Sequence, residues 1–236
     1  CAFDQITNFA AKCRYRWGAS VPLVIRCPSG GGIHGGPFHS QNPEMHFVHT
    51  PGLKVVAPST AYDAKGLIKS AIRDEDPVIY FEHKYLYRRI KEELPDDEFL
   101  VPIGKADIKR KGKDISLITY GAMVHNALEA AKVLAQDGID LEVVDLRTLV
   151  PLDKATVLES VKKTNKVILL HEDVRTGGFA GELAAIIAEE TFEYLDGPVM
   201  RITAPDTPVP FSPPLEEFFL PKTSDIIRVA KQLAIY

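Results

Sequence analysis

Residues 28–41 read Pro28-Ser29-Gly30-Gly31-Gly32-Ile33-His34-Gly35-Gly36-Pro37-Phe38-His39-Ser40-Gln41. This stretch follows an apolar, β-branched run at residues 21–25 that shows almost no polar alternation and therefore predicts a buried parallel strand. In open α/β sheets, ligands bind in the crevice outside the carboxyl ends of the strands. A glycine-rich loop at such an end is a candidate wall of an active site.

The glycines and histidines of this stretch allow two interpretations. Five glycines in the seven positions 30–36 permit positive φ angles and a close approach to a ligand or a neighbouring subunit. They also suit an irregular turn, since no GxGxxG or Walker pattern is present. His39 stands beside Ser40 and Gln41, so a titratable group adjoins two hydrogen-bonding ones. For His34 a hydrogen-bonded structural role is the simpler interpretation.

Helix and strand patterns alternate along the chain. Strands are predicted at residues 21–25, 53–57, 78–81, 99–103, 106–109, 115–120, 141–145, 167–170 and 199–202. Helices are predicted at residues 3–17, 44–49, 60–73, 122–137, 153–164, 178–190 and 224–235, with Thr60 as an N-cap and Asp63 at the capping-box offset. This order predicts parallel sheets joined by right-handed crossovers. We expect a first domain over residues 1–97, a linker over residues 98–114 and a second α/β domain over residues 115–236.

The composition excludes several classes of protein. A formal charge of −4 and a pI near 6.0 give no electrostatic footprint for nucleic acid or an anionic membrane. No apolar run approaches the roughly 20 residues that span a bilayer. The three cysteines are odd in number and lack CxxC spacing, which disfavours a disulfide framework or a zinc cluster and indicates a reducing compartment.

Three further groups of residues are candidates for function. His171, Glu172 and Asp173 follow a predicted strand, as an acid/base or metal cluster would, although adjacent strand residues point in alternating directions. Asp145 and Arg147 also follow a strand, where a structural ion pair or a helix cap is the simpler role. Aromatic residues among prolines suit either a packed surface segment or a subunit contact: Phe211, Phe218 and Phe219.

Ordered blocks at residues 25–41, 51–58, 63–67, 76–79, 102–106, 144–148 and 204–208 resemble the beta subunit of the thiamine-diphosphate-dependent 2-oxo acid dehydrogenases. The resemblance covers essentially the whole chain. It implies an α/β fold, with part of a pyrimidine-binding parallel-sheet domain followed by a transketolase C-terminal-like domain. Beta subunits of this family carry a further N-terminal segment with the glutamate that activates the cofactor, so we expect this sequence to be a fragment.

The resemblance also implies a cofactor and metal ions. Thiamine diphosphate and magnesium would lie between an alpha and a beta subunit, with the diphosphate on the alpha subunit and the pyrimidine on the beta subunit. His39 would be the retained beta residue near the cofactor, and the other cofactor contacts would lie before Cys1. Family members of the branched-chain type bind potassium, and the matching positions are Val21, Leu23, Val24, Ala71, Asp74 and Asp76. Oxygen ligands suit potassium, although a simple acidic turn before Pro77 is the alternative.

The function that the resemblance implies is oxidative decarboxylation of branched-chain 2-oxo acids, with acyl transfer to a lipoyl domain. His39 would donate a proton to the departing lipoyl sulfur. The expected partners are an alpha subunit, a second beta subunit in an α2β2 assembly and the lipoyl acyltransferase component. We expect the cytoplasm, with the mitochondrial matrix as the other compartment. A pyruvate or acetoin dehydrogenase subunit and a catalytically inert assembly fragment are the alternatives.

Overall fold

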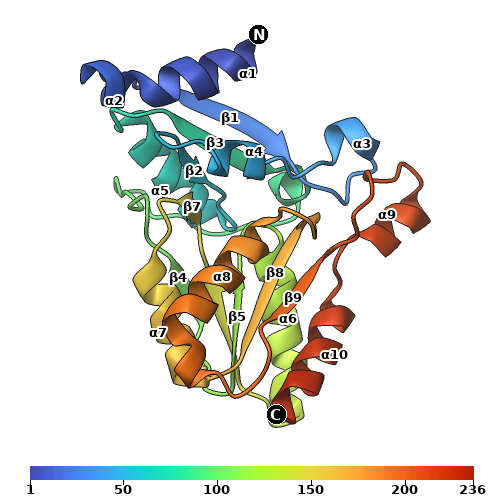
Figure 1. The fold of residues 1–236 in the computed structure, drawn as a ribbon. Coiled ribbons are helices and arrows are strands. Elements are labelled where there is room, and N and C mark those ends of the chain that lie inside the picture. The colour runs from blue at the N-terminus through green and yellow to red at the C-terminus, as the bar shows by residue number, and fades with distance from the viewer.

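Two sheets of different strand order form the core of the computed structural model, which describes residues 1–236 (Figure 1). The four-stranded sheet has the order β1-β3-β2-β7, and the five-stranded sheet has the order β4-β6-β5-β8-β9. The strands are β1 (Val24–Ser29), β2 (Lys54–Val56), β3 (Val78–His83), β4 (Asp107–Arg110), β5 (Ile115–Thr119), β6 (Leu141–Asp145), β7 (Thr148–Val150), β8 (Val167–Val174) and β9 (Met200–Ala204).

Helices cover the faces of both sheets. The α-helices are α1 (Ala2–Asp4), α2 (Cys13–Trp17), α3 (Gly36–His39), α4 (Met45–Val48), α5 (Ala61–Ile72), α6 (Met123–Gln136), α7 (Lys154–Thr164), α8 (Phe179–Thr191), α9 (Pro213–Phe219) and α10 (Thr223–Ala234). None of the helices is both long enough and apolar enough to cross a membrane.

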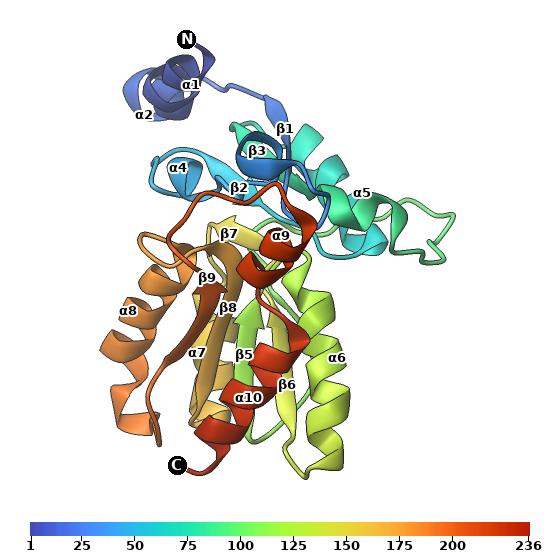
Figure 2. The ribbon, with the colours of Figure 1, turned by 90° about the vertical axis from the view of Figure 1, so that its right-hand side faces the viewer.

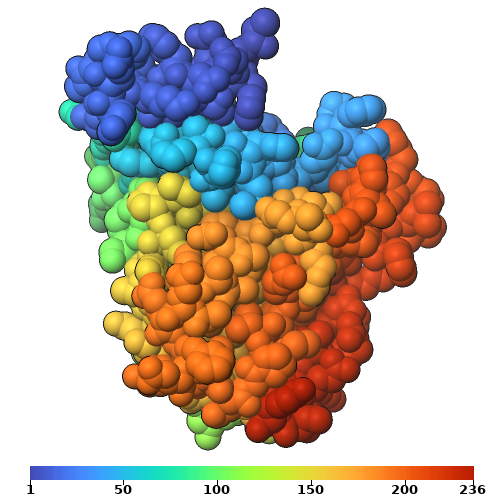
Figure 3. All heavy atoms as spheres, in the orientation of Figure 1, coloured from blue at the N-terminus to red at the C-terminus, as the bar shows by residue number.

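The first domain follows the predicted alternation of helix and strand. β1 and β2 both lie parallel to β3. β1 begins at Val24 and is only partly buried because it is an edge strand of its sheet, so the prediction of a buried strand at residues 21–25 was wrong, whereas β3 is almost fully buried. Helix α5 begins after Thr60, whose hydroxyl accepts the N–H of Asp63 at 3.0 Å, as the capping pattern predicts. The predicted helix over residues 3–17 is instead a succession of α, π and 3₁₀ turns that ends at Gly18 and forms a ridge at one end of the molecule (Figure 3).

The second domain is a mostly parallel sheet between two helical layers. α6 and α10 cover one face of the five-stranded sheet, and α7 and α8 cover the other (Figure 2). Successive residues of β5 point to opposite layers, since Leu117 packs beneath α6 and Ile118 beneath α7. Both faces are therefore apolar, which explains the continuous hydrophobic runs in the sequence.

Several elements differ from the sequence prediction. β7 belongs to the second half of the chain but pairs antiparallel with β2, so that the second half adds a strand to the first sheet. Residues 99–103 form no strand, because Val101 is buried against α5 instead of pairing in a sheet. Within the expected linker, β4 pairs antiparallel with β6 as an edge of the second sheet. A three-residue strand such as β7 is too short to show a reliable period, whereas β4 lies where a strand was predicted at residues 106–109.

Candidate functional site

The glycine-rich loop, residues 30–36, lies where β1 ends and is fixed there by Glu172 of β8 (Figure 1). Glu172 Oε1 accepts the N–H of Gly31 at 2.6 Å and the Nδ2–H of Asn42 at 3.1 Å. Its Oε2 lies 2.9 Å from His83 Nε2. Burial of Glu172 opposes its ionisation, but the charge and hydrogen bond of His83 and the bonds from Gly31 and Asn42 outweigh burial and lower the pKa of Glu172.

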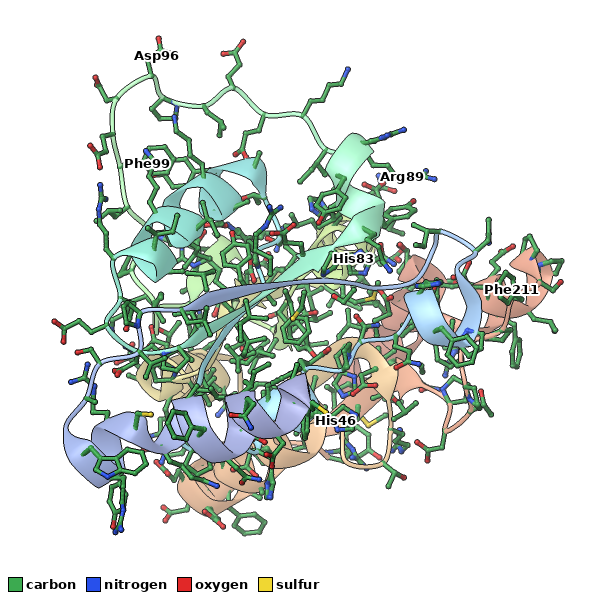
Figure 4. All side chains as sticks on the ribbon, turned by 90° about the horizontal axis from the view of Figure 1, so that it is seen from above. His46, His83, Arg89, Asp96, Phe99 and Phe211 are labelled. Carbon is green, nitrogen blue, oxygen red and sulfur yellow. The ribbon has the colours of Figure 1, made fainter.

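Glu216 of α9 holds the next part of the same loop. Its carboxylate accepts the N–H of Gly32 at 3.1 Å and the N–H of His34 at 3.0 Å. The Nδ1 of His34 lies 2.6 Å from the same carboxylate, and His34 has a positive φ of 57°. This geometry favours the hydrogen-bonded structural role for His34. Figure 4 shows Phe211, at the entry to α9, lying beside α3, where any side chain at Gly36 would collide with the Phe211 ring.

His39 occupies an exposed turn at the end of α3. Its carbonyl oxygen accepts a hydrogen bond from Lys84 Nζ, but its imidazole forms no hydrogen bond or ion pair within the chain. The buried Ser40 beside it accepts the N–H of Gly35 at 3.0 Å, and the carbonyl of Gln41 accepts the N–H of Gly30 at 2.9 Å. The loop is therefore closed at its base, and the His39 imidazole is open to a molecule outside the chain.

The backbone N–H groups of the glycine loop show whether this loop could bind the diphosphate of thiamine diphosphate. Every N–H from residue 30 to residue 35 except that of Ile33 already donates to an acceptor of this chain. Phosphate-binding loops need free N–H groups that point at the anion. Most of the loop amides are therefore not available as a cradle for the diphosphate.

The residues predicted to bind potassium lie together at the start of the first sheet. Val21 donates its N–H to the carbonyl of Glu75 at 2.9 Å, and the carbonyl of Leu23 accepts the N–H of Val78 at 2.9 Å. Around the Asp74 turn, Lys54 Nζ lies 2.6 and 2.7 Å from the two carboxylate oxygens of Asp74.

The remaining members of that set are also engaged within the chain. The carbonyl of Ala71 accepts the N–H of Asp74 at 3.2 Å, Val24 pairs with Val78, and Asp76 is bound by Arg14. No group of three or more His, Cys, Asp or Glu side chains is placed so that it could hold a metal ion. Lysine and arginine therefore balance the charge of the acidic turn in this structure, and potassium binding there stays a prediction.

A third buried carboxylate, that of Glu44, lies between the two domains. Glu44 Oε1 accepts the O–H of Tyr120 at 2.5 Å, beside a cavity of about 20 Å³ that is also lined by His83 and Glu172. Burial, followed by the nearby charge of Asp173, raises the pKa of Glu44 to about 7. The cavity has room for about one water molecule, and His83 Nδ1 has no partner within the chain. Because its pKa is about 7, the carboxyl of Glu44 gains or loses its proton near neutral pH.

This charge change predicts a pH-dependent stability. A glutamate carboxyl ordinarily has a pKa of 4.5, as we expect in the unfolded chain, whereas the pKa of Glu44 in the folded chain is about 7. At pH values between 4.5 and 7 the folded chain therefore binds more protons than the unfolded chain. The free energy of unfolding should then fall as the pH rises from about 4.5 to 7. We expect Glu44→Gln, which keeps an acceptor for Tyr120, to match the parent near pH 4 and to be more stable by about 2 kcal/mol at pH 8. Urea unfolding at several pH values measures the difference.

The control for this prediction is Glu129→Gln on the exposed face of α6, where Glu129 forms only a surface pair with Lys132. Its difference from the parent should stay within about 0.5 kcal/mol at every pH. A pH profile of Glu44→Gln that runs parallel to that of the parent would show that Glu44 is charged in the folded chain across this range.

The predicted cluster of His171, Glu172 and Asp173 does not form one site. All three residues lie within β8 rather than after it, and their side chains alternate as strand geometry requires. His171 Nδ1 lies 3.1 Å from the carbonyl of Asp173, and burial lowers the pKa of His171 to about 4, so that the ring is neutral at pH 7. Burial raises the pKa of Asp173 to about 6.

The interdomain clamp, as we call Asp63, Lys109, Asp145 and Arg147, joins the two domains through buried charges. Asp63 of α5 lies 2.6 Å from Lys109 Nζ and 3.0 Å from a guanidinium nitrogen of Arg147. Asp145 accepts the hydroxyl of Ser59 at 2.5 Å and the N–H of Arg147 at 3.1 Å. Arg147 is thus part of a structural ion pair, as expected, but its carboxylate partner is Asp63.

Sequence reasoning missed the role of the carboxylates that hold the loop. Glu172 stood in a candidate cluster, but nothing in the sequence paired it with Gly31. Glu216 carried no signal at all, because α9 was not predicted and its partner Gly32 lies 184 residues away. Of the three aromatic residues near α9, Phe219 is buried, whereas Phe211 and Phe218 are exposed.

Comparisons with known proteins agree with this architecture. Models of the transketolase pyrimidine binding domain and of the transketolase C-terminal domain match residues 2–90 and 104–226. The chain is 51% identical to the 2-oxoisovalerate dehydrogenase subunit beta of Bacillus subtilis, over 99% of this chain and 72% of that protein. It is 46% identical to the pyruvate dehydrogenase E1 component subunit beta of the same organism, over 98% of this chain and 71% of that protein.

A solved structure supports the fold. A split gene transketolase, described as an inactive beta4 tetramer, superimposes with a TM-score of 0.74 at 24% sequence identity. The match covers 96% of this chain and 74% of that one. Both predicted domain types, the pyrimidine-binding parallel sheet and the transketolase C-terminal-like domain, are thereby confirmed.

Proposed function

The chain belongs to the family of 2-oxo acid dehydrogenase beta subunits, which is thiamine-diphosphate-dependent, and we propose that it serves the branched-chain type. It would be the beta subunit of the component that decarboxylates branched-chain 2-oxo acids and passes the acyl group to a lipoyl domain. The higher identity to the 2-oxoisovalerate enzyme, 51% against 46% for the pyruvate enzyme, supports this choice of substrate. Pyruvate and acetoin enzymes, and a catalytically inert assembly fragment, are the alternatives.

The observation that carries the proposal is the placement of the His39 imidazole. Five of the seven N–H groups at residues 30–36 donate to acceptors of this chain while the imidazole of His39 stays free, as a proton donor to an incoming partner would need. Thiamine diphosphate, when bound, supplies the electron sink for loss of carbon dioxide. His39 would act on the lipoyl group: as the disulfide opens, the departing sulfur takes a proton from the imidazolium.

The assembly that we propose follows from the occupied loop. The diphosphate and magnesium would be held by an alpha subunit, in an α2β2 assembly that also docks a lipoyl acyltransferase component. Potassium would bind through Val21, Leu23, Val24, Ala71, Asp74 and Asp76, in competition with Lys54 for the carboxylate of Asp74. We propose a cytoplasmic location, with the mitochondrial matrix as the alternative. We also propose that residues 1–97 form the first domain, residues 98–114 a linker and residues 115–236 the second domain.

Turnover by the complete assembly tests this function. The beta chain is combined with its alpha partner, and turnover of 2-oxoisovalerate, pyruvate and acetoin is compared with an artificial electron acceptor, which reports decarboxylation of the two 2-oxo acids and oxidative cleavage of acetoin. We expect kcat/KM for 2-oxoisovalerate to exceed that for pyruvate by about 10-fold or more, since each additional methyl group in an apolar pocket is worth roughly 10- to 200-fold. A preference for pyruvate or acetoin would reassign the substrate, and no turnover of any of them would favour the assembly fragment.

A further inference from the structure

One carboxylate oxygen binds the chain on both sides of His39. Gly31 lies eight residues before His39 and Asn42 three residues after it. Glu172 Oε1 lies 2.6 Å from the Gly31 nitrogen and 3.1 Å from the Asn42 Nδ2. The segment between these two anchors is the segment that presents the His39 imidazole to the outside.

The anchoring carboxylate is itself rigidly held. Glu172 is 6% exposed and lies within β8, a central strand of the second sheet, rather than on a loop. His83 of β3 binds its second oxygen at 2.9 Å, so both domains fix the carboxylate. Hydrogen bonds to an ionised group are roughly twice as strong as neutral ones.

Glycine at position 31 suits this contact. A Cβ there would lie 2.9 Å from a terminal methyl of Leu220 and 3.1 Å from Glu172 Oε1, so the neighbouring side chains would have to shift to admit one. The absence of a side chain therefore eases the approach of the backbone to the carboxylate at 2.6 Å. The Gly30-Gly31-Gly32 run of the sequence is thus explained in part by a protein carboxylate rather than by a phosphate.

We propose that Glu172 is a positioning residue for acyl transfer, which fixes both ends of the segment that carries His39. This inference rests on the proposed function of His39. Catalytic groups must be held close to the productive geometry, and a displacement of about 1 Å can reduce a rate by roughly 10²-fold. Glu172 does not touch the substrate; it restricts where the imidazole can lie.

Two variants separate positioning from a general effect on folding. Glu172→Ala removes all three contacts, whereas Glu172→Gln keeps an acceptor for Gly31 and Asn42 and presents its amide to His83. In the complete assembly we expect Glu172→Ala to lower acylation of a lipoyl domain by about 10- to 100-fold. Decarboxylation followed with an artificial electron acceptor should change by less than about 3-fold, and Glu172→Gln should restore most of the acylation.

The matched control is Glu217→Ala, because Glu217 is exposed beside Glu216 and forms only a surface pair with Lys222 at 3.1 Å. It should leave both rates unchanged. If Glu172→Ala lowers both activities equally, or does not lower acylation, Glu172 is not a positioning residue. The proposed function is tested separately, by the effect of His39→Ala on the same two activities.

Hydrogen exchange gives a readout that is independent of activity. The amides of Gly31 and Gly32, measured on the peptide that contains them in the assembled protein, should exchange at least about 10-fold faster in Glu172→Ala than in the parent. Unchanged exchange would show that Glu172 does not fix the loop. If His39→Ala proves to have no selective effect on acylation, this measurement still decides whether Glu172 holds the segment.

Discussion

Replacing Asp63 by Ala is expected to lower the free energy of unfolding by about 3 to 4 kcal/mol, because it leaves buried cations without their shared partner. Asp63 has no measurable exposure and contacts Lys109 at 2.6 Å and Arg147 at 3.0 Å. Lys109 retains Asp107 at 2.8 Å, and Arg147 retains two carbonyl oxygens, so the loss should lie at the low end of the range for a broken buried pair.

Burial disfavours the charge of Asp63, but hydrogen bonds from Lys109 and Thr60 and the charge of Arg147 outweigh it, so that its pKa is lowered. A lowered pKa means that this stabilisation is present at neutral pH and is lost as the pH falls through the folded-state value. The destabilisation by Asp63→Ala should therefore be largest near pH 7 and smaller in acid.

Urea unfolding, followed by two probes, measures the effect. Trp17, the single tryptophan, reports on the first domain, and far-ultraviolet circular dichroism reports on the whole chain. Because Asp63 belongs to the first domain, Lys109 to the edge strand of the second sheet and Arg147 to the second domain, the two transitions should coincide in the parent and separate in the variant.

The matched controls are a conservative variant and a surface variant. Asp63→Asn keeps the bond to Thr60 and should lose about half as much stability as Asp63→Ala. Glu129→Ala removes only an exposed i, i+3 pair and should change stability by less than about 0.5 kcal/mol. Coincident transitions with a loss below about 1 kcal/mol in Asp63→Ala would mean that apolar contacts, not the clamp, couple the domains.

Local signals in the sequence predicted those parts of the fold that local interactions determine. Thr60 and Asp63 set the start of α5, and Asp153, the first residue of the helix predicted at residues 153–164, caps α7 by accepting the N–H of Thr156. The helix predicted at residues 122–137 ends just before Gly138, whose φ is 79°. Each of these features depends on residues within one turn of the helix end, so a single sequence is sufficient to find it.

Contacts between distant segments could not be predicted in this way. The pairing of β2 with β7 brings together strands that lie in different halves of the chain, and neither is longer than three residues. The same holds for the site: His39 was identified by its neighbours in the sequence, whereas Glu172 and Glu216 bind the glycine loop from positions that are 141 and 184 residues away from Gly31 and Gly32. Acidic side chains are normally exposed, so their sequence pattern gives no sign that they are buried against a glycine loop.

Replacing His39 by Ala is expected to give the largest functional effect. In the complete assembly it should reduce acylation of a lipoyl domain by roughly 10² to 10⁴-fold, the usual contribution of a general acid. The lipoyl sulfur that leaves as a thiolate must take a proton, and histidine is the side chain that most often donates one in catalysis. The exposed imidazole, with no partner in the chain, is free to reach that sulfur.

Two assays separate this role from a structural one. Loss of carbon dioxide does not need a proton from His39, so decarboxylation with an artificial electron acceptor should fall by less than about 10-fold in His39→Ala. His49→Ala is the matched control, because His49 follows α4 outside the glycine loop and should leave both rates unchanged. If His39→Ala lowers both rates equally while the assembly stays intact, His39 acts before acyl transfer, and the lipoyl sulfur must take its proton from another donor.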